Sequence, residues 1–148
     1  MRHRIEVIHG VNLDTLGSRP AEHYGTFTLG ELQAGISDHA RELGLDVSFM
    51  QTNHEGTFCE HLHRAPEVAD GLIVNPGAWT HYSYAIRDAL EITGLPAVEV
   101  HISDIERREP WRRTSVIRDV CFATIMGKGA DGYREALELL KQRFAESG

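Results

Sequence analysis

The stretch LIVNPGAWTHYSYAIRDALEITGLPAVEV, residues 72–100, decides the fold. Residues 72–74 are apolar, as expected of a short buried strand, and Asn75-Pro76-Gly77 ends it. The segment from about Thr80 to Ile92 has apolar residues at helical spacing, and a second apolar strand follows at residues 97–100. A strand, a crossover helix and another strand predict two parallel neighbours in one sheet. The helical residues expected to face inward are Ala85, Ile86, Ala89 and Leu90.

The same alternation of strand and helix runs through the rest of the chain. Further strands are predicted at residues 5–8, 47–50 and 120–126, and further helices at 28–43, 57–64 and from Asp131 onward. Thr28 and Glu31 form a capping-box pattern at the start of the first helix. Short apolar strands alternating with amphipathic helices indicate a parallel sheet covered on both faces. We therefore predict a single α/β domain over residues 1–148, a doubly wound, five-stranded parallel sheet of the flavodoxin-like type.

Composition limits the classes of function. The chain has 148 residues and a formal net charge of −7, which argues against nucleic acid or an anionic membrane as the main partner. Cys59 and Cys121 lie far apart and form no CxxC pair, so reduced thiols are favoured over a disulfide. The N-terminus has no apolar signal core, and no segment approaches the ~20 apolar residues of a membrane span. We expect a cytoplasmic protein.

Three sequence features could each be taken for a functional site, but their context argues against it. Residues 127–132 match GxGxxG, but no second strand follows to complete a dinucleotide site, so a strand-to-helix turn is the better interpretation. His54, His61 and His63 are not spaced as metal ligands, and we interpret them as surface or capping residues. Cys59 falls inside an amphipathic helix and is interpreted as structural. The sequence predicts neither a metal site nor a cofactor.

The polar residues with chemical potential follow the strands. In a doubly wound sheet, ligands bind outside the carboxyl ends of the strands, which places the site at loops 9–25, 51–56, 75–81 and 101–115. Glu99 and His101 fall on one face of a strand by the period of two, so the carboxylate is expected to fix the imidazole tautomer. Several arginines follow in a stretch without lysine. Together these groups suit a small, oxygen-rich anion.

Tyr24 is the candidate base. It follows Arg19 by five residues in a loop rich in Gly and Pro, which we expect to be a mobile lid at about residues 17–25. A phenol titrates near pH ~10, but guanidinium groups held against its oxygen favour the phenolate. The alternative for this segment taken alone is a surface tyrosine in a loop.

With these residues in hand, the chain resembles the type II 3-dehydroquinate dehydratases, the small, metal-free dehydroquinases. The resemblance covers nearly the whole length in several blocks that occur in order. The blocks are Gly10-x-Asn12-Leu13-x-x-Leu16-Gly17-x-Arg19, Tyr24-Gly25, Gln51-Thr52-Asn53-His54-Glu55-Gly56, Asn75-Pro76-Gly77-Ala78-x-Thr80-His81-Tyr82-Ser83, Arg87-Asp88-Ala89, Glu99-Val100-His101-Ile102-Ser103, Arg108-Glu109, Arg112 and Gly129-x-x-Gly132-Tyr133.

The resemblance implies a trans elimination of water from 3-dehydroquinate to 3-dehydroshikimate, a step of the shikimate pathway. It makes Tyr24 the base that removes the C2 proton, with Arg19 and Arg108 holding it as phenolate. Asn12 would stabilise the enolate oxygen through a water. His101, oriented by Glu99, would protonate the departing C1 hydroxyl.

The resemblance also assigns substrate binding and assembly. The residues that would hold the carboxylate and ring hydroxyls are Asn75, His81, Ile102, Ser103 and Arg112. Asp88 would reach a neighbouring subunit's site, in a homo-oligomer of trimers assembled into dodecamers. From the residues alone, Asp88 is equally well a solvated charge on the outer face of its helix, beside Arg87 and Glu91.

One separate feature of the sequence supports this chemistry. The other way to dehydrate such a ketone uses a lysine Schiff base. Lys128 lies in a Gly-rich turn and Lys141 on the polar side of the last helix, and these are the only lysines. Chemistry through an enolate is what remains.

The chain departs from the family pattern at His9, Val11, Pro20, Trp79 and Glu106-Arg107. None of these departures removes a catalytic group, but they bear on lid closure and substrate preference. Two alternatives therefore stay open. One is a paralogue acting on an amino-substituted dehydroquinate or in quinate breakdown. The other is a non-catalytic, flavodoxin-like nucleotide-binding module.

Overall fold

A five-stranded parallel sheet forms the centre of the computed structural model, which describes residues 2–147. The strands lie in the order β2-β1-β3-β4-β5. In the register, Val7 pairs with Phe49 on one side and with Ile73 on the other, and Val98 joins Ile73 to Ala123. The strand bounds are β1 Arg4–His9, β2 Asp46–Gln51, β3 Gly71–Asn75, β4 Ala97–His101 and β5 Ala123–Met126.

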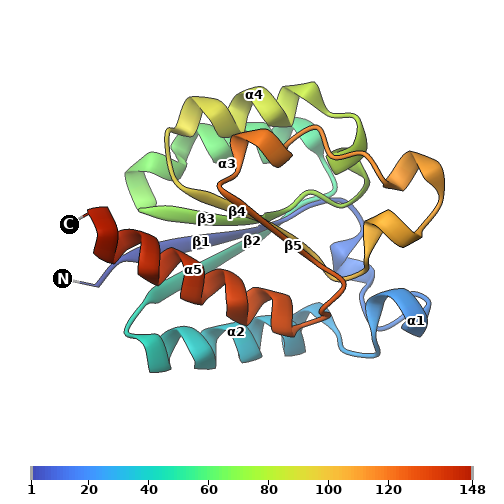
Figure 1. Ribbon diagram of the computed structural model, residues 1–148, viewed down its shortest axis with the longest axis horizontal. Coiled ribbons are helices and arrows are strands. Elements are labelled where there is room, and N and C mark those ends of the chain that lie inside the picture. Colours follow the sequence, from blue (N-terminus) through green and yellow to red (C-terminus); the bar gives the residue numbers. More distant parts are fainter. Residues whose placement is uncertain (1, 148) are drawn as a thin grey trace.

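Helices cover both faces of the sheet (Figure 1). Helices α2 (Leu29–Leu43) and α5 (Asp131–Ser147) cover one face, and α3 (Glu55–Val68) and α4 (Tyr84–Thr93) cover the other. Alternate strand residues enter two separate cores, because successive side chains of a strand point to opposite faces. Val7 and Ile73 pack under α2 and α5, whereas Ile8, Leu72 and Val74 pack under α3 and α4.

This arrangement confirms the predicted flavodoxin-like, doubly wound α/β fold in a chain with a single sheet. Because all the strands are parallel, the loops that follow them lie at one end of the sheet, opposite the two ends of the chain (Figure 1). The order of the strands changes direction between the neighbours β1 and β3, which is where such folds bind ligands. Each of the first four strands is slightly longer than predicted. The extra residues matter because His9, Asn75 and His101 are the last residues of β1, β3 and β4.

Two predicted helices have different bounds in the structure. The segment before α4 forms a short 3-10 helix, η2 (Gly77–His81), and α4 begins only at Tyr84, because Ser83 caps it by accepting from the Ile86 amide. Ala85 consequently does not face inward as predicted: it is exposed. Helix α3 extends the predicted 57–64 segment at both ends and tolerates Pro66 in its last turn. The inward residues of α4 are Ile86, Ala89, Leu90 and Thr93.

The chain between β4 and β5 is built from short 3-10 helices: η3 (Ile105–Arg107), η4 (Pro110–Arg112) and η5 (Arg118–Val120). The strand predicted at 120–126 is therefore wrong at its start. Arg87 of α4 pairs with Asp119 and donates to the Val116 carbonyl (2.9 Å), which holds this segment in a turn. Arg87 is thus an ion-paired anchor rather than a solvated charge.

Several local predictions are confirmed. Thr28 and Glu31 form the reciprocal capping box at the start of α2. The GxGxxG segment is a strand-to-helix turn, in which the Asp131 amide donates to the Lys128 carbonyl at 3.1 Å as α5 begins. Both cysteines are free thiols. His61 corrects the interpretation of the histidines as surface groups, because it binds the buried Glu6 carboxylate, which also accepts from Ser48. Among residues 2–147, no helix combines the length and hydrophobicity needed to span a bilayer.

Candidate active site at the carboxyl edge of the sheet

One cavity at the carboxyl ends of the strands collects most of the predicted site residues. Glu99 lies directly behind it, and Asp88 lies outside it on the exposed face of α4. Four apolar or small residues complete the lining: Leu13, Gly77, Ala78 and Ile105. The predicted residues that line the cavity are Asn12, Arg19, Tyr24, Asn75, His81, His101, Ile102, Ser103, Arg108 and Arg112.

Tyr24 ends a short helix, α1 (Ala21–Tyr24), within the segment predicted as a lid loop, and only 9% of the residue is exposed. Arg108 donates through Nη1 to the Tyr24 hydroxyl at 2.5 Å. The Arg19 guanidinium instead lies over the ring, 4.0 Å from its centre. Arg108 is therefore the group that contacts the phenol oxygen, while Arg19 covers the ring face. The phenol of Tyr24 is thus in contact with two guanidinium groups, one at its oxygen and one over its ring.

Glu99 and His101 form a buried pair at the end of β4. The Glu99 side chain is 0% exposed, and its Oε2 lies 2.5 Å from Nε2 of His101. Ser115 donates to the same carboxylate at 2.7 Å and Thr124 at 3.2 Å. Burial by itself would raise the pKa of Glu99, but the hydrogen bond and charge of His101, with Ser115, outweigh it and leave that pKa below its usual value. An ionised Glu99 fixes the hydrogen on Nε2 and leaves Nδ1 for a ligand.

Asn12 stands on a loop after β1 that a second loop supports. Its φ of 69° is in the left-handed region, which asparagine tolerates better than most residues. Asn53 accepts from the Asn12 amide at 2.9 Å and donates to Asp14 at 3.0 Å. Gln51 donates to the Gly10 carbonyl at 3.1 Å. The loop after β2 thus fixes the backbone from which the Asn12 side chain enters the cavity.

The loops after β1 and β3 touch each other at two glycines. A Cβ on Gly10 would lie 2.3 Å from the Pro76 carbonyl oxygen, and one on Gly77 would lie 2.5 Å from that of Val11. Only glycine allows this approach of two backbones. Asn75 is held in the same region: it donates to the Tyr133 hydroxyl at 3.3 Å and accepts from the Gly77 amide at 3.1 Å. Burial raises the pKa of Tyr133 to about 12, so this hydroxyl stays neutral.

His81, the last residue of η2, and Arg112, the last residue of η4, also line the cavity. Nδ1 of His81 lies 2.7 Å from the Thr114 carbonyl, which can only accept, so Nδ1 carries the hydrogen and Nε2 is an acceptor. Partial burial lowers the pKa of His81, and the hydrogen bond to Thr114 opposes this only in part. Arg112 is oriented by Glu109, which accepts from its Nε at 2.9 Å.

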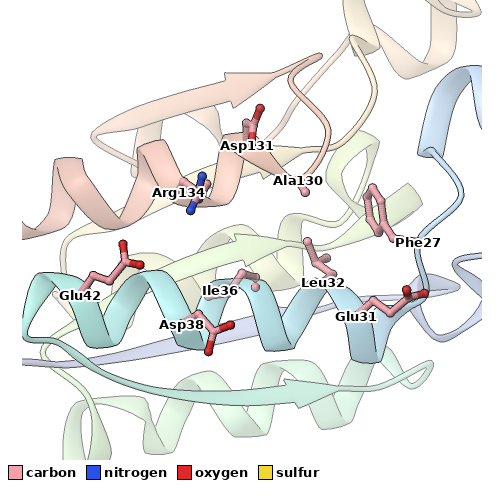
Figure 2. A pocket seen from close by; sticks show the side chains of 10 residues that line it. Phe27, Glu31, Leu32, Ile36, Asp38, Glu42, Ala130, Asp131 and Arg134 are labelled. Carbon is pink, nitrogen blue, oxygen red and sulfur yellow. The ribbon is translucent and has the colours of Figure 1, made fainter.

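Other parts of the molecule offer less to a small polar ligand. A second hollow lies between α2 and α5, where Phe27, Leu32 and Ile36 meet several carboxylates and Arg134 (Figure 2). None of the predicted site residues lines it, and Glu31 and Asp38 are already paired with Thr28 and Arg41. Within residues 2–147, no three His, Cys, Asp or Glu side chains are grouped so that they could hold a metal ion.

The sequence interpretation missed the supporting residues. Ser115 and Thr124 satisfy Glu99, Asn53 fixes Asn12, and Tyr133 binds Asn75. Only Thr124 carried a usable signal, because it lies at the position opposite Glu99 when β4 and β5 pair. The others meet their partners through loop conformations or a helix crossing that the sequence pattern does not specify.

Comparisons with known proteins agree with this geometry. The family model described as dehydroquinase class II matches residues 3–141. A 3-dehydroquinate dehydratase of Thermotoga maritima is 50% identical over 97% of this chain and 98% of its own length. The crystal structure of a type II dehydroquinase from Propionibacterium acnes superposes with a TM-score of 0.90 at 42% identity, covering 96% of this chain and 98% of that one. That of a type II dehydroquinase from Butyrivibrio crossotus gives 0.92 at 40% identity, covering 94% and 97%. The chain belongs to the class II dehydroquinase family.

Proposed function

We propose that this chain is a type II 3-dehydroquinate dehydratase, a hydro-lyase that converts 3-dehydroquinate to 3-dehydroshikimate through an enolate. The observation that carries the proposal is the arrangement of two reactive pairs around one cavity. Arg108 binds the Tyr24 hydroxyl at 2.5 Å, and Glu99 binds His101 at 2.5 Å. The first pair supplies a base and the second an acid, which are the two groups that loss of water from a β-hydroxy ketone requires.

Tyr24 is the base in this mechanism. Its phenolate, held by Arg108 and covered by Arg19, takes the C2 proton, which is acidic because the neighbouring C3 carbonyl stabilises the resulting carbanion as an enolate. The phenolate needs no metal ion to stabilise it, because the two guanidinium groups compensate its negative charge.

His101 is the acid. The enolate expels the C1 hydroxyl, and His101, acting as an imidazolium, gives that oxygen the proton on Nδ1 while its Nε2–H stays bound to Glu99. Asn12, placed by Asn53, stabilises the enolate oxygen. The substrate thus loses a proton from C2 and a hydroxide from C1. The hydroxide leaves as water because His101 protonates it, so the net change is the loss of one water. Asn75, His81, Ser103 and Arg112, with the backbone at Ile102, hold the carboxylate and the ring hydroxyls.

The positions of the lysines support a route without a Schiff base. Lys128 is exposed and pairs with Glu135 at 2.6 Å, and Lys141 is exposed on α5. Neither lines the cavity. A lysine that forms an iminium with a ketone has to reach that ketone inside the site, so the enolate forms directly from the bound ketone.

We extend the proposal to assembly. Asp88 is exposed on α4 and lies outside its own cavity, in keeping with a contact to the site of an adjacent subunit in a trimer, with four trimers forming a dodecamer. Tyr84 and Ile92 of the same helix are 67% and 69% exposed, and such apolar side chains are commonly covered by a partner. We also propose that the protein works in the cytoplasm.

The test of the function is incubation of the purified protein with 3-dehydroquinate. Because the product is a conjugated enone, its ultraviolet absorbance should rise with time, before and after dialysis against a chelator. Borohydride added with substrate should leave the enzyme active, since there is no imine to reduce. Folded protein that produces no absorbance would refute the proposed activity, and irreversible labelling of Lys128 or Lys141 would refute the route.

A further inference from the structure

One aromatic side chain contacts two walls of the cavity without lining it. Trp111, in the middle of η4, has a residue exposure of 52%. Its indole lies edge-on to the His81 imidazole, with ring centres 5.4 Å apart and planes at 90°. The Arg112 guanidinium lies over its ring, 4.1 Å from the centre. His81 and Arg112 both line the cavity, whereas Trp111 does not.

These two contacts use the two electrostatic features of an aromatic ring. The electron-rich face attracts a cation, and perpendicular packing suits a second aromatic ring. Each neighbour also has one polar anchor: the Thr114 carbonyl for His81 and Glu109 for Arg112. A single anchor leaves a side chain free to rotate about the remaining bonds, so the indole is the common surface that fixes both groups relative to each other.

We propose that Trp111 is a positioning residue. It holds the acceptor nitrogen of His81 and the donor groups of Arg112 in the orientation that binds the ring hydroxyls and the carboxylate of the substrate. The identity of that substrate rests on the proposed function, but the positioning role does not. Half of Trp111 is exposed, so its loss removes little buried surface from the fold. Its effect should therefore be on binding.

Three variants test the role. Trp111→Leu removes the aromatic ring, and Trp111→Phe keeps a face for Arg112 and an edge for His81. Phe122→Leu is the matched control, because Phe122 is also a partly exposed aromatic ring with a guanidinium above it, that of Arg143 at 4.9 Å, and it lies outside the cavity. Circular dichroism and sedimentation should first establish that each variant keeps the fold and assembly of the parent.

The measurements are KM and kcat for 3-dehydroquinate and the calorimetric Kd for quinate, which keeps the carboxylate and ring hydroxyls but lacks the ketone. We expect Trp111→Leu to raise KM and the quinate Kd by about tenfold with kcat changed less than twofold, since uniform binding is lost. Trp111→Phe should restore most of the affinity, and Phe122→Leu should change neither constant.

The outcomes separate the two proposals. Turnover with unchanged KM and Kd in Trp111→Leu would overturn the positioning role and leave the proposed function intact. Quinate binding that weakens in Trp111→Leu and recovers in Trp111→Phe, in a protein without turnover, would support the role and refute the function. If the parent protein neither turns over 3-dehydroquinate nor binds quinate, both the positioning role and the proposed function are overturned. An affinity loss seen only when the variant dissociates would assign Trp111 to a subunit contact instead and overturn the role.

Discussion

At the scale of single residues, the site depends on charges that are compensated in place. Arg108 contacts the Tyr24 hydroxyl, and Glu99 is satisfied by His101, Ser115 and Thr124. His9, which does not line the cavity, is a buried polar side chain without such partners. It is 0% exposed at the end of β1, packs near Phe49 and Tyr133, and neither ring nitrogen has a hydrogen-bond partner.

This isolation of His9 predicts a dependence of stability on pH. Burial lowers the pKa of His9 to about 4, against a weaker opposing effect of Gln33. The unfolded chain takes up a proton on His9 below its ordinary pKa of about 6.5, whereas the folded protein does not until about pH 4. The stability associated with His9 is therefore complete above pH 6.5 and falls as the pH drops toward 4. The loss amounts to about 3 kcal/mol across that window.

Urea unfolding of the parent, of His9→Asn and of His63→Asn between pH 7 and pH 4 measures this effect. His9→Asn should lose less stability than the parent over this range. The difference between the two losses should be about 3 kcal/mol, the loss assigned to His9. The exposed His63 serves as the control, and its variant should follow the parent. Parallel curves for all three proteins would show that His9 is not the group responsible.

At the scale of elements, what the sequence predicts is the order of strands and helices, because the apolar periods of two and 3.6 are local properties. The pairing of Glu99 with His101 was predictable for the same reason, since they lie two residues apart on one strand. The bounds near 77–83 and 118–122 were not predictable, because turns there depend on tertiary contacts. The Val116 amide donates to Thr80 at 2.9 Å, and Arg87 holds Asp119. Likewise, Arg108 and Tyr24 are separated by 84 residues, so no local pattern shows which arginine meets the phenol oxygen.

At the scale of the whole molecule, we propose that one face of α4 takes part both in assembly and in the site of an adjacent subunit. Asp88 and Glu91 are both exposed on α4, and only Asp88 is proposed to contact another subunit's site. Asp88→Ala should weaken the oligomer, lower kcat/KM, or do both, although it leaves its own cavity unchanged. Glu91→Ala is the control from the same face and should have little effect. Sedimentation at assay concentration checks assembly, and a fully active monomer would contradict the proposed shared site.

The central claim is that Tyr24 removes the C2 proton and His101 acts afterwards on the C1 hydroxyl. The most direct measurement is exchange of the C2 proton of 3-dehydroquinate in deuterium oxide, followed by nuclear magnetic resonance alongside turnover. Tyr24→Phe should lower both exchange and turnover by about 10²–10⁴-fold while quinate still binds, because a general base is lost and the binding groups remain. His101→Ala should lose turnover to a similar degree yet still exchange the proton. Near-normal turnover by Tyr24→Phe would contradict the account.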